Sequence, residues 1–543
     1  MTKTAFDPLA QRYASQRYPL YARNGMVNCS CPQASAAGLE ILRAGGNAMD
    51  AAVAAAAVLT VAEPVSNGIG GDAFALIWSE KDRRLYGLNA SGPAPRLASI
   101  DRVLADGRDQ DGRMPRFGWT PVTVPGIPMA WAEIARRFGA LPLSRTLAPA
   151  VRYAREGYPC APTVAQAWQK ACAHYRKVLP GPVSEEWFRT FAPQGRGPAA
   201  GEMVRLPFHA DTLEAIGETG AAAFYTGDLA RRIDACSRKN GGYLRYEDLA
   251  AYQARWVEPI HVDYRGFRVC EIPPNGQGIA ALAALNILKE FDFPERDSPR
   301  TAHRQIEAMK MAFADVLDSV TDPDHMQADY RLLLDPAYGA RRAAQMGDEA
   351  RVWTRSLPPR SGTVYLCCGD GAGNLVSYIQ SNYHGFGSGV VVDGTGIALQ
   401  NRGSDFSLDP AAANCLMPGK RSYHTIIPGF LMKGDDPVGP FGVMGGYMQP
   451  QGHVQVVMNY ADFSLDPQQA LDAPRWQWMR DGSVTVESRF DPEIARALRR
   501  MGHDLRMELN TPSFGRGQMI VRLDSGVLVG GTESRADSNI ACW

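Results

Sequence analysis

The pattern of hydrophobic and polar positions changes near residue 363. Before that point, apolar residues recur at helical spacing, which predicts helices over residues 35–44, 47–61, 126–158, 163–178, 278–290 and 302–320. Strands are expected there at residues 73–79, 85–89 and 261–272. After that point, valine, isoleucine and aromatic residues alternate in short runs between glycines, which predicts strands at residues 375–380, 389–392, 483–487, 517–522 and 526–530. The pattern alone predicts a mixed α/β protein that is helix-rich first and strand-rich last.

Composition and charge narrow the range of partners. The 543 residues are 45% hydrophobic and 21% charged, as in ordinary soluble globular proteins. The 57 basic and 57 acidic residues balance, so nothing favours nucleic acid or an anionic membrane surface as a partner. The longest apolar run, residues 51–62, is shorter than the ~20 residues that a membrane span needs. We therefore expect a small-molecule substrate, no nucleic acid and no membrane.

Targeting, metal and cofactor signals are weak. Residues 1–21 contain no apolar stretch of the kind found in secretory signals, so we expect a cytoplasmic protein. The ten cysteines form no C-x-x-C pair, which favours reduced, buried thiols and no metal site. Gly68–Ala73 matches a dinucleotide-binding G-x-G-x-x-A loop, but turn residues rather than a strand precede it. G-x-S-x-G and H-E-x-x-H motifs are absent, and no cofactor is expected.

The strongest chemical signal lies between Ser361 and Gly389. This segment reads as strand, turn, strand and glycine-rich loop, and it follows an expected exposed loop at residues 353–360. Cleavage between Gly362 and Thr363 would leave a threonine with both a hydroxyl nucleophile and a free α-amine. An α-amine titrates near pH ~7.7–8.0, so it can serve as the base for that hydroxyl. The alternative is that Thr363 is only a β-branched strand residue.

This segment resembles the start of the small subunit in γ-glutamyltransferases, which are N-terminal-nucleophile hydrolases. Further motifs occur in the family's order, and the resemblance covers nearly the whole chain: residues 34–78, 124–131, 273–278, 399–410 and 444–446. The resemblance implies a four-layer αββα sandwich. It also implies a precursor cut into a large subunit (25–362) and a small subunit (363–543). The two subunits would stay together as a heterodimer that shares one core. Residues 1–24 are polar and are expected to form an arm.

The resemblance also implies catalytic roles. Thr363 would attack first the Gly362 carbonyl and later the substrate amide. Ser381, where the family usually has threonine, would hold the new α-amine. Backbone N–H groups of Gly445 and Gly446 would bind the developing oxyanion. For Ser381 and for the glycine pair, an ordinary turn is the alternative.

The expected substrate-binding set departs from the family pattern in its charges. Asp405 would pair with a substrate α-ammonium, or form a structural turn. Ser91, with Asn89 nearby, replaces the arginine that binds the γ-glutamyl carboxylate. Arg402 stands in place of a glutamine, so one cation is lost and another gained.

Three further members of this set also differ from the family. Tyr383 stands in place of an asparagine, and His424 and Thr425 stand in place of paired serines. His384 and His424 could titrate near neutrality or be structural histidines.

These features predict an autoprocessing amidase that acts on a γ-glutamyl or similar small-acid amide through an acyl-enzyme. Hydrolysis is expected, with transfer to an amine also open. One alternative keeps the chemistry but changes the substrate, as in relatives that hydrolyse oxamate or glutaryl-cephalosporin side chains. A second alternative is a non-processing scaffold, which the intact Thr363, Ser381, Gly445 and Gly446 disfavour.

Overall fold

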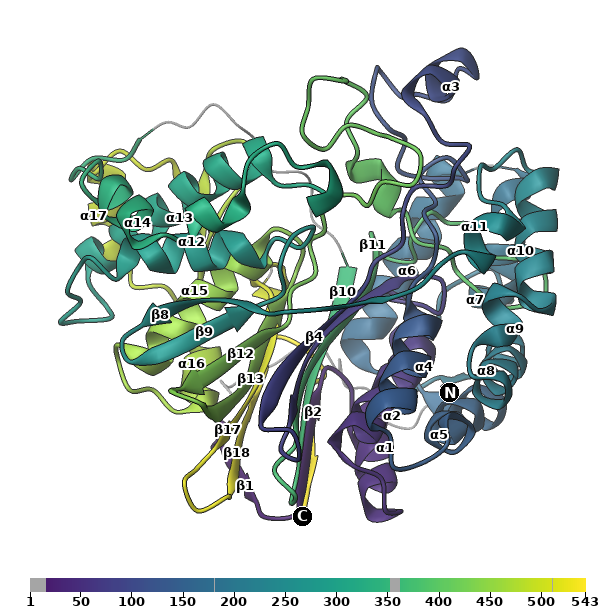
Figure 1. The fold of residues 1–543 in the computed structure, drawn as a ribbon, viewed down its shortest axis with the longest axis horizontal. Helices are drawn as coiled ribbons and strands as arrows, with labels where there is room; N and C mark the ends of the chain where they lie inside the picture. Colours follow the sequence, from purple (N-terminus) through teal and green to yellow (C-terminus); the bar gives the residue numbers. More distant parts are fainter. Residues whose placement is uncertain (1–15, 180, 352–361, 510) are drawn as a thin grey trace.

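Two seven-stranded antiparallel sheets lie face to face and carry helices on their outer sides (Figure 1). The computed structural model describes residues 16–179, 181–351, 362–509 and 511–543. One sheet has the order β1(Leu20–Ala22), β18(Leu528–Thr532), β17(Arg516–Arg522), β13(Asp436–Met444), β12(Gly429–Lys433), β9(Phe267–Glu271), β8(Ile260–Tyr264). The other has the order β19(Asn539–Cys542), β2(Gly25–Cys29), β10(Gly362–Asp370), β11(Leu375–Tyr383), β3(Asp72–Ser79), β4(Arg84–Ala90), β7(Arg255–Val257). The expected four-layer αββα sandwich is confirmed.

Each helical layer belongs to a different stretch of the chain, as the colours of Figure 1 show. Helices on the side of the β10 sheet are α1(Pro32–Arg43), α2(Ala48–Ala62), α4(Ile127–Phe138), α5(Leu143–Glu156), α6(Pro162–Val178), α7(Glu185–Phe191), α8(Pro207–Thr219), α9(Ala222–Tyr225), α10(Asp228–Lys239) and α11(Tyr246–Ala250). Those on the side of the β13 sheet are α12(Gly278–Leu288), α13(Pro299–Ser319), α14(Pro336–Ala343), α15(Met448–Ala461), α16(Pro467–Asp472) and α17(Pro492–Arg500). Helix α3(Ile100–Ala105) is peripheral, and two small sheets pair β5(Tyr158–Pro159) with β6(Met203–Val204) and join β14(Trp476–Trp478), β15(Val484–Glu487) and β16(Leu505–Glu508).

The inner helices α2 and α12 are buried along their whole length. Alanine is the commonest residue in both, and such small side chains let each helix pack close to its neighbours. Helix α2 begins with a reciprocal cap in which Asn47 and Asp50 accept each other's backbone N–H groups. The predicted helices at 35–44, 47–61 and 278–290 are therefore confirmed.

Strands from both sides of residue 362 interleave in both sheets. In one sheet, β10 and β11 lie between β2 and β3; in the other, β18, β17, β13 and β12 lie between β1 and β9. The sheets meet closely where the Tyr365 ring covers Gly442, because a Cβ there would lie 2.5 Å from that ring. Each of the two largest hydrophobic clusters therefore contains residues from both parts of the chain.

Several expectations need correction. The strand expected at 261–272 is a hairpin of β8 and β9, because Arg265 and Gly266 turn the chain at φ +51° and +80°. Residues 389–392 form a loop in which Val391 makes an isolated bridge to Ala398. Within the predicted arm, β1 pairs with β18. Residues 1–15 and the expected exposed loop at 353–360 lie outside the described residues.

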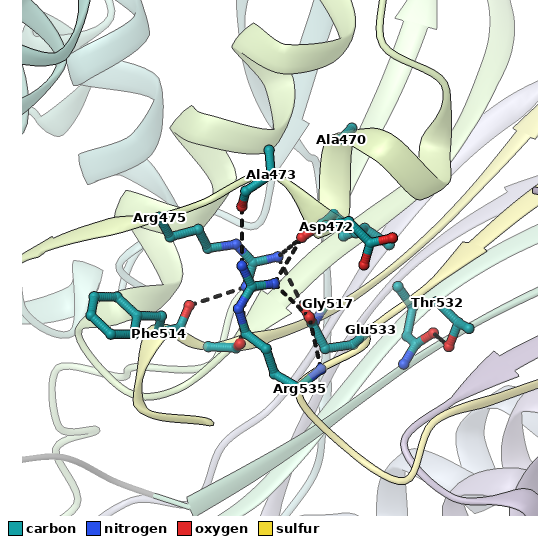
Figure 2. A network of polar contacts seen from close by, with 12 residues as sticks. Ala470, Asp472, Ala473, Arg475, Phe514, Gly517, Thr532, Glu533 and Arg535 are labelled. Atoms are coloured by element: carbon teal, nitrogen blue, oxygen red, sulfur yellow. Dashed lines mark hydrogen bonds and ion pairs between the residues drawn. The ribbon is translucent and has the colours of Figure 1, made fainter. Parts of the chain in front are cut away.

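A buried ionic network braces the strand-rich part of the chain (Figure 2). Glu533 accepts from Arg475 over 2.9 Å and from Arg535 over 2.6 Å, and Arg535 also binds Glu487. These four side chains are at most 2% exposed, so each charge depends on its partners. Arg475 also holds the carbonyl of Gly515 over 2.9 Å, next to the site described below.

No helix among the described residues is long and apolar enough to cross a membrane.

Candidate active site

Thr363 lies near the start of β10 with its side chain buried. Its Oγ1 lies 3.2 Å from the Ser381 Oγ, and Ser381 donates to the Gly362 carbonyl oxygen over 2.6 Å. Ser381 can therefore accept a hydrogen bond from the Thr363 hydroxyl while its own hydroxyl polarises the Gly362 carbonyl. The structure brings together the three residues expected at the cleavage site.

A local irregularity in the sheet creates this arrangement. The pairing of β10 with β11 shifts between Gly362 and Val364, so that Ser381 and Asn382 lie opposite Thr363 alone. Tyr383 follows in the left-handed region at φ +74°, and its N–H donates to the Ser381 Oγ over 2.8 Å. A bulky residue in that region costs about 1–3 kcal/mol, and such strain gathers at functional sites.

Asp405 ends the short 3₁₀ helix η4(Arg402–Asp405) and faces the protein's own donors. It accepts from the Tyr383 hydroxyl over 2.9 Å and from the Tyr447 hydroxyl over 3.2 Å. Burial raises the pKa of Asp405, while the nearby Arg402 and the two hydroxyls oppose that rise. A substrate ammonium that paired with Asp405, as expected, would therefore have to replace contacts that Asp405 already makes with two tyrosine hydroxyls and with Arg402.

Arg402 is the most unusual buried side chain of the site. It is 1% exposed, and its guanidinium lies 3.8 Å above the Tyr383 ring. Its nearest carboxylate oxygen, on Asp405, is 3.9 Å away, beyond hydrogen-bond distance. All three guanidinium nitrogens lack a hydrogen-bond partner among the described residues.

Gly445 and Gly446 connect the end of β13 to the start of α15. Their φ angles of +140° and +62° lie where residues with side chains are strained. Fourteen-residue helix α15 points its N-terminus toward this connection, which favours negative charge there. A Cβ on Gly445 would lie 3.3 Å from the Cα of Gly515, whose carbonyl Arg475 holds. The ionic network of Figure 2 thus supports the expected oxyanion-binding loop.

The expected binding residues Asn89, Ser91 and His424 belong to a buried polar network. Ser91 donates to Asn89 over 2.7 Å, and Asn89 donates to Asn275 over 2.9 Å. His424 Nε2 lies 3.1 Å from the Asp72 carboxylate. Burial, with Arg402 nearby, lowers the pKa of His424 well below its ordinary value, so it stays neutral and donates to Asp72. These contacts occupy the three side chains within the protein.

His384 and Thr425 keep polar atoms for a ligand. His384 Nε2 and Thr425 Oγ1 are buried and lack partners among the described residues. Burial, Arg402 and Arg116 lower the pKa of His384 to about 3. The expectation that His384 and His424 could titrate near neutrality was wrong, because burial beside a cation disfavours the imidazolium.

Two residues of the site have no role in the sequence-based prediction. Tyr447 directly follows the glycine pair, and its position there is the one signal that it could belong to the site. Gln277 lies within PPNGQG at residues 273–278, a motif that the resemblance includes without a role. Its Nε2 donates to the carbonyl of Gly446 over 2.8 Å.

A separate cluster has residue types that bind metals. His303, Glu307 and His503 offer ligand atoms within 4.8 Å of one another. Lys310 lies 2.8 Å from Glu307 and 3.4 Å from His503, so its ammonium supplies the positive charge in this cluster. We assign no metal or cofactor to these residues.

Comparison with known proteins places the chain in a family. The model of the family described as gamma-glutamyltranspeptidase matches residues 34–543. The chain belongs to this family. It is thus an N-terminal-nucleophile amide hydrolase or acyltransferase, as the sequence analysis predicted.

Individual family members differ in what their names say they act on. The crystal structure of cephalosporin acylase from Bacillus halodurans is 55% identical, with a TM-score of 0.95 and 99% of each chain covered. Glutathione hydrolase-like YwrD proenzyme of Bacillus subtilis is 36% identical over 93% of this chain and 95% of its own. Oxamate amidohydrolase proenzyme of Klebsiella pneumoniae is 35% identical over 95% of this chain and 98% of its own. Family membership therefore leaves the acyl group open.

Proposed function

We propose that this protein is an autoprocessing N-terminal-threonine amidase whose substrates carry a carboxylate on the acyl group. In the precursor, Thr363 Oγ1 attacks the carbonyl carbon of Gly362 and its proton passes to the Thr363 nitrogen. The bond from that carbon to the nitrogen breaks, and an ester forms. Water then cleaves the ester and leaves a Gly362 carboxylate and a free Thr363 α-amine. The hydrogen bond of 2.6 Å from Ser381 to the Gly362 oxygen supports this step.

In turnover, the same hydroxyl attacks the carbonyl carbon of a substrate amide. The α-amine takes the hydroxyl proton and passes it to the departing amine. N–H groups of Gly445 and Gly446 stabilise the oxyanion, helped by the N-terminus of α15. Water then releases the acid from the acyl-threonine, or a second amine accepts the acyl group.

The buried, unpartnered guanidinium of Arg402 is the observation on which the proposed acyl preference rests. A buried guanidinium without hydrogen-bond partners is costly, and a carboxylate offers the planar pair of acceptors that matches it. Stacking at 3.8 Å on Tyr383 orients the plane of the guanidinium. A carboxylate on the acyl group of the substrate therefore suits this site.

An acyl group without an α-ammonium fits the rest of the site better. The Asp405 carboxylate already accepts from two tyrosine hydroxyls and faces Arg402. This favours monoamides of dicarboxylic acids, in line with the name of the oxamate amidohydrolase relative. A γ-glutamyl amide is the second candidate, because the Asp405 carboxylate can pair with the α-ammonium of such a substrate. One relative is also called glutathione hydrolase-like. The intact cleavage-site geometry disfavours a scaffold role.

The test is a panel of anilides that share a leaving group. We expect processed protein to hydrolyse glutaryl-p-nitroanilide with at least about 10-fold higher kcat/KM than butyryl-p-nitroanilide, because a charge-assisted pair contributes about 1.5–3 kcal/mol. Arg402→Met should remove that preference, measured as the ratio of the two kcat/KM values. Equal rates on both anilides in the wild type, or a preference for γ-glutamyl-p-nitroanilide, would contradict the proposed acyl group.

A further inference from the structure

The PPNGQG segment at residues 273–278 contacts the part of the chain that follows Thr363. Gly276 and His424 form a parallel bridge, in which the Gln277 N–H donates to the His424 carbonyl over 2.9 Å. The His424 N–H donates to the Asn275 carbonyl over 2.8 Å. The backbone around Gln277 is therefore fixed against the segment that carries Thr425.

The Gln277 side chain extends this contact to the glycine pair. Its Nε2 donates to the Thr425 carbonyl over 2.6 Å and to the Gly446 carbonyl over 2.8 Å, and the residue is fully buried. Because both neighbours are carbonyl oxygens, the amide nitrogen must face them, and both of its hydrogens are used. Gln277 thus links Thr425 to Gly446. It precedes the expected cleavage point in the sequence, whereas both of its partners follow that point.

The glycine pair needs such a contact to hold one conformation. Two successive glycines have a wide choice of backbone angles, and their N–H groups stabilise an oxyanion only when they are held in place. The Gly446 carbonyl has two donors, Gln277 Nε2 and the Gln449 N–H at 3.1 Å. Gln449 belongs to α15 and orients the carbonyl only relative to that helix. Gln277 orients the Gly446 carbonyl relative to Thr425, which lies outside that helix.

We propose that Gln277 is a positioning residue that holds the Gly445–Gly446 loop in its oxyanion-binding conformation. The inference rests on the proposed function, since it assigns Gln277 to the same amide cleavage. Gln277 touches neither Thr363 nor the reacting atoms and acts through the Gly446 carbonyl. Its loss therefore affects the transition state, where the oxyanion forms, and spares substrate binding.

The experiment compares Gln277→Leu with Gln455→Leu on glutaryl-p-nitroanilide. Gln455 is a matched control, because its buried Nε2 also donates to two carbonyls, those of Gln451 and Trp476, at 3.0 Å each. Rates are expressed per processed chain, counted by intact mass, and melting temperatures are recorded for both variants. Gln277→Leu should lower kcat about 10- to 100-fold with KM within about 3-fold of the wild type. Gln455→Leu should lower the melting temperature similarly and keep kcat.

Gln277→Glu provides a second variant of the same shape. An ionised carboxylate donates no hydrogen bond to the carbonyls of Thr425 and Gly446, so kcat should fall at least as far as in Gln277→Leu. An unchanged kcat in Gln277→Leu, or an equal loss of kcat in Gln455→Leu, would overturn this inference and leave the proposed function standing. Unfolding of both Gln277 variants beside a folded Gln455→Leu would also overturn it, because it would show a purely structural role. No turnover of any anilide by the wild type would overturn the proposed function and this inference with it.

Discussion

Ser381 donates its hydroxyl to the carbonyl oxygen of Gly362 over 2.6 Å, so the residue expected to hold the new α-amine already contacts the bond to be cut. The Ser381 Oγ also lies 3.2 Å from the Thr363 Oγ1, from which it can accept a hydrogen bond. One side chain can thus assist both the cleavage of the precursor and the later positioning of the nucleophile.

Ser381→Ala should slow self-cleavage by about 10-fold or more, because a donor to a developing oxyanion is typically worth about 10²–10³ in rate. The measurement is the fraction of cleaved chain over time on a denaturing gel. Ser381→Thr keeps the hydroxyl and should process at a near-normal rate. Ser377→Ala is the matched control, since Ser377 is buried on the same strand and binds the Tyr365 hydroxyl instead. Normal processing in Ser381→Ala would contradict this role.

Gly446→Ala should lower kcat about 100-fold, because a Cβ at φ +62° strains the loop that offers its N–H groups. Gly434→Ala provides the control: Gly434 has φ +59°, and a Cβ there meets no atom within 4 Å. Both variants carry similar backbone strain, so we expect a similar loss of stability in each. A lower kcat in Gly446→Ala alone would then show that Gly446 acts in catalysis. Equal kcat in the two variants would argue against an oxyanion role for Gly446.

The pH dependence of kcat/KM should reflect the Thr363 α-amine. The pKa of His384 is about 3 and that of His424 is well below its ordinary value, so both imidazoles are neutral at neutral pH. Activity should therefore rise with pH and level off above pH ~8, as the α-amine loses its proton. The same inflection in His384→Gln would support this assignment. Burial raises the pKa of Asp72 to about 7, so Asp72→Asn is a needed second control and should also keep the inflection.

Glu533→Gln should lower the free energy of unfolding by about 3–5 kcal/mol at neutral pH, because it leaves buried arginine charges uncompensated. The arginines hold the pKa of Glu533 at about 2, below the ordinary glutamate value near 4.3. Its ionised form therefore stabilises the fold above about pH 4.3, and that contribution is lost as pH falls toward 2. Urea unfolding at several pH values should show the gap to the wild type closing in this window. Glu493→Gln, which breaks an exposed pair with Arg496, should cost less than about 1 kcal/mol.

The sequence predicted the fold and indicated a candidate cleavage site, because both depend on local patterns and on motifs in order. The buried alanine-rich run of α2 and the Gly362–Thr363 step can be read from neighbouring residues. The pairing of Asp405 with Tyr447 could not be predicted, because these residues are distant in sequence and meet only in the folded chain. The neutral state of His384 depends on burial beside Arg402 and Arg116, and the role of Gln277 depends on two carbonyls in other segments. Charge environment and cross-chain hydrogen bonds are properties of the tertiary structure.

Intact mass and N-terminal sequencing of the purified protein, beside Thr363→Ala and Thr363→Ser, test the central claim most directly. We expect two fragments in the wild type, residues 1–362 and 363–543, whose masses sum to that of the chain plus one water. Thr363→Ala should remain a single chain, and Thr363→Ser should cleave at the same bond. A wild-type chain that stays intact after long incubation, or a Thr363→Ala variant that cleaves, would contradict Thr363 as the self-activating nucleophile.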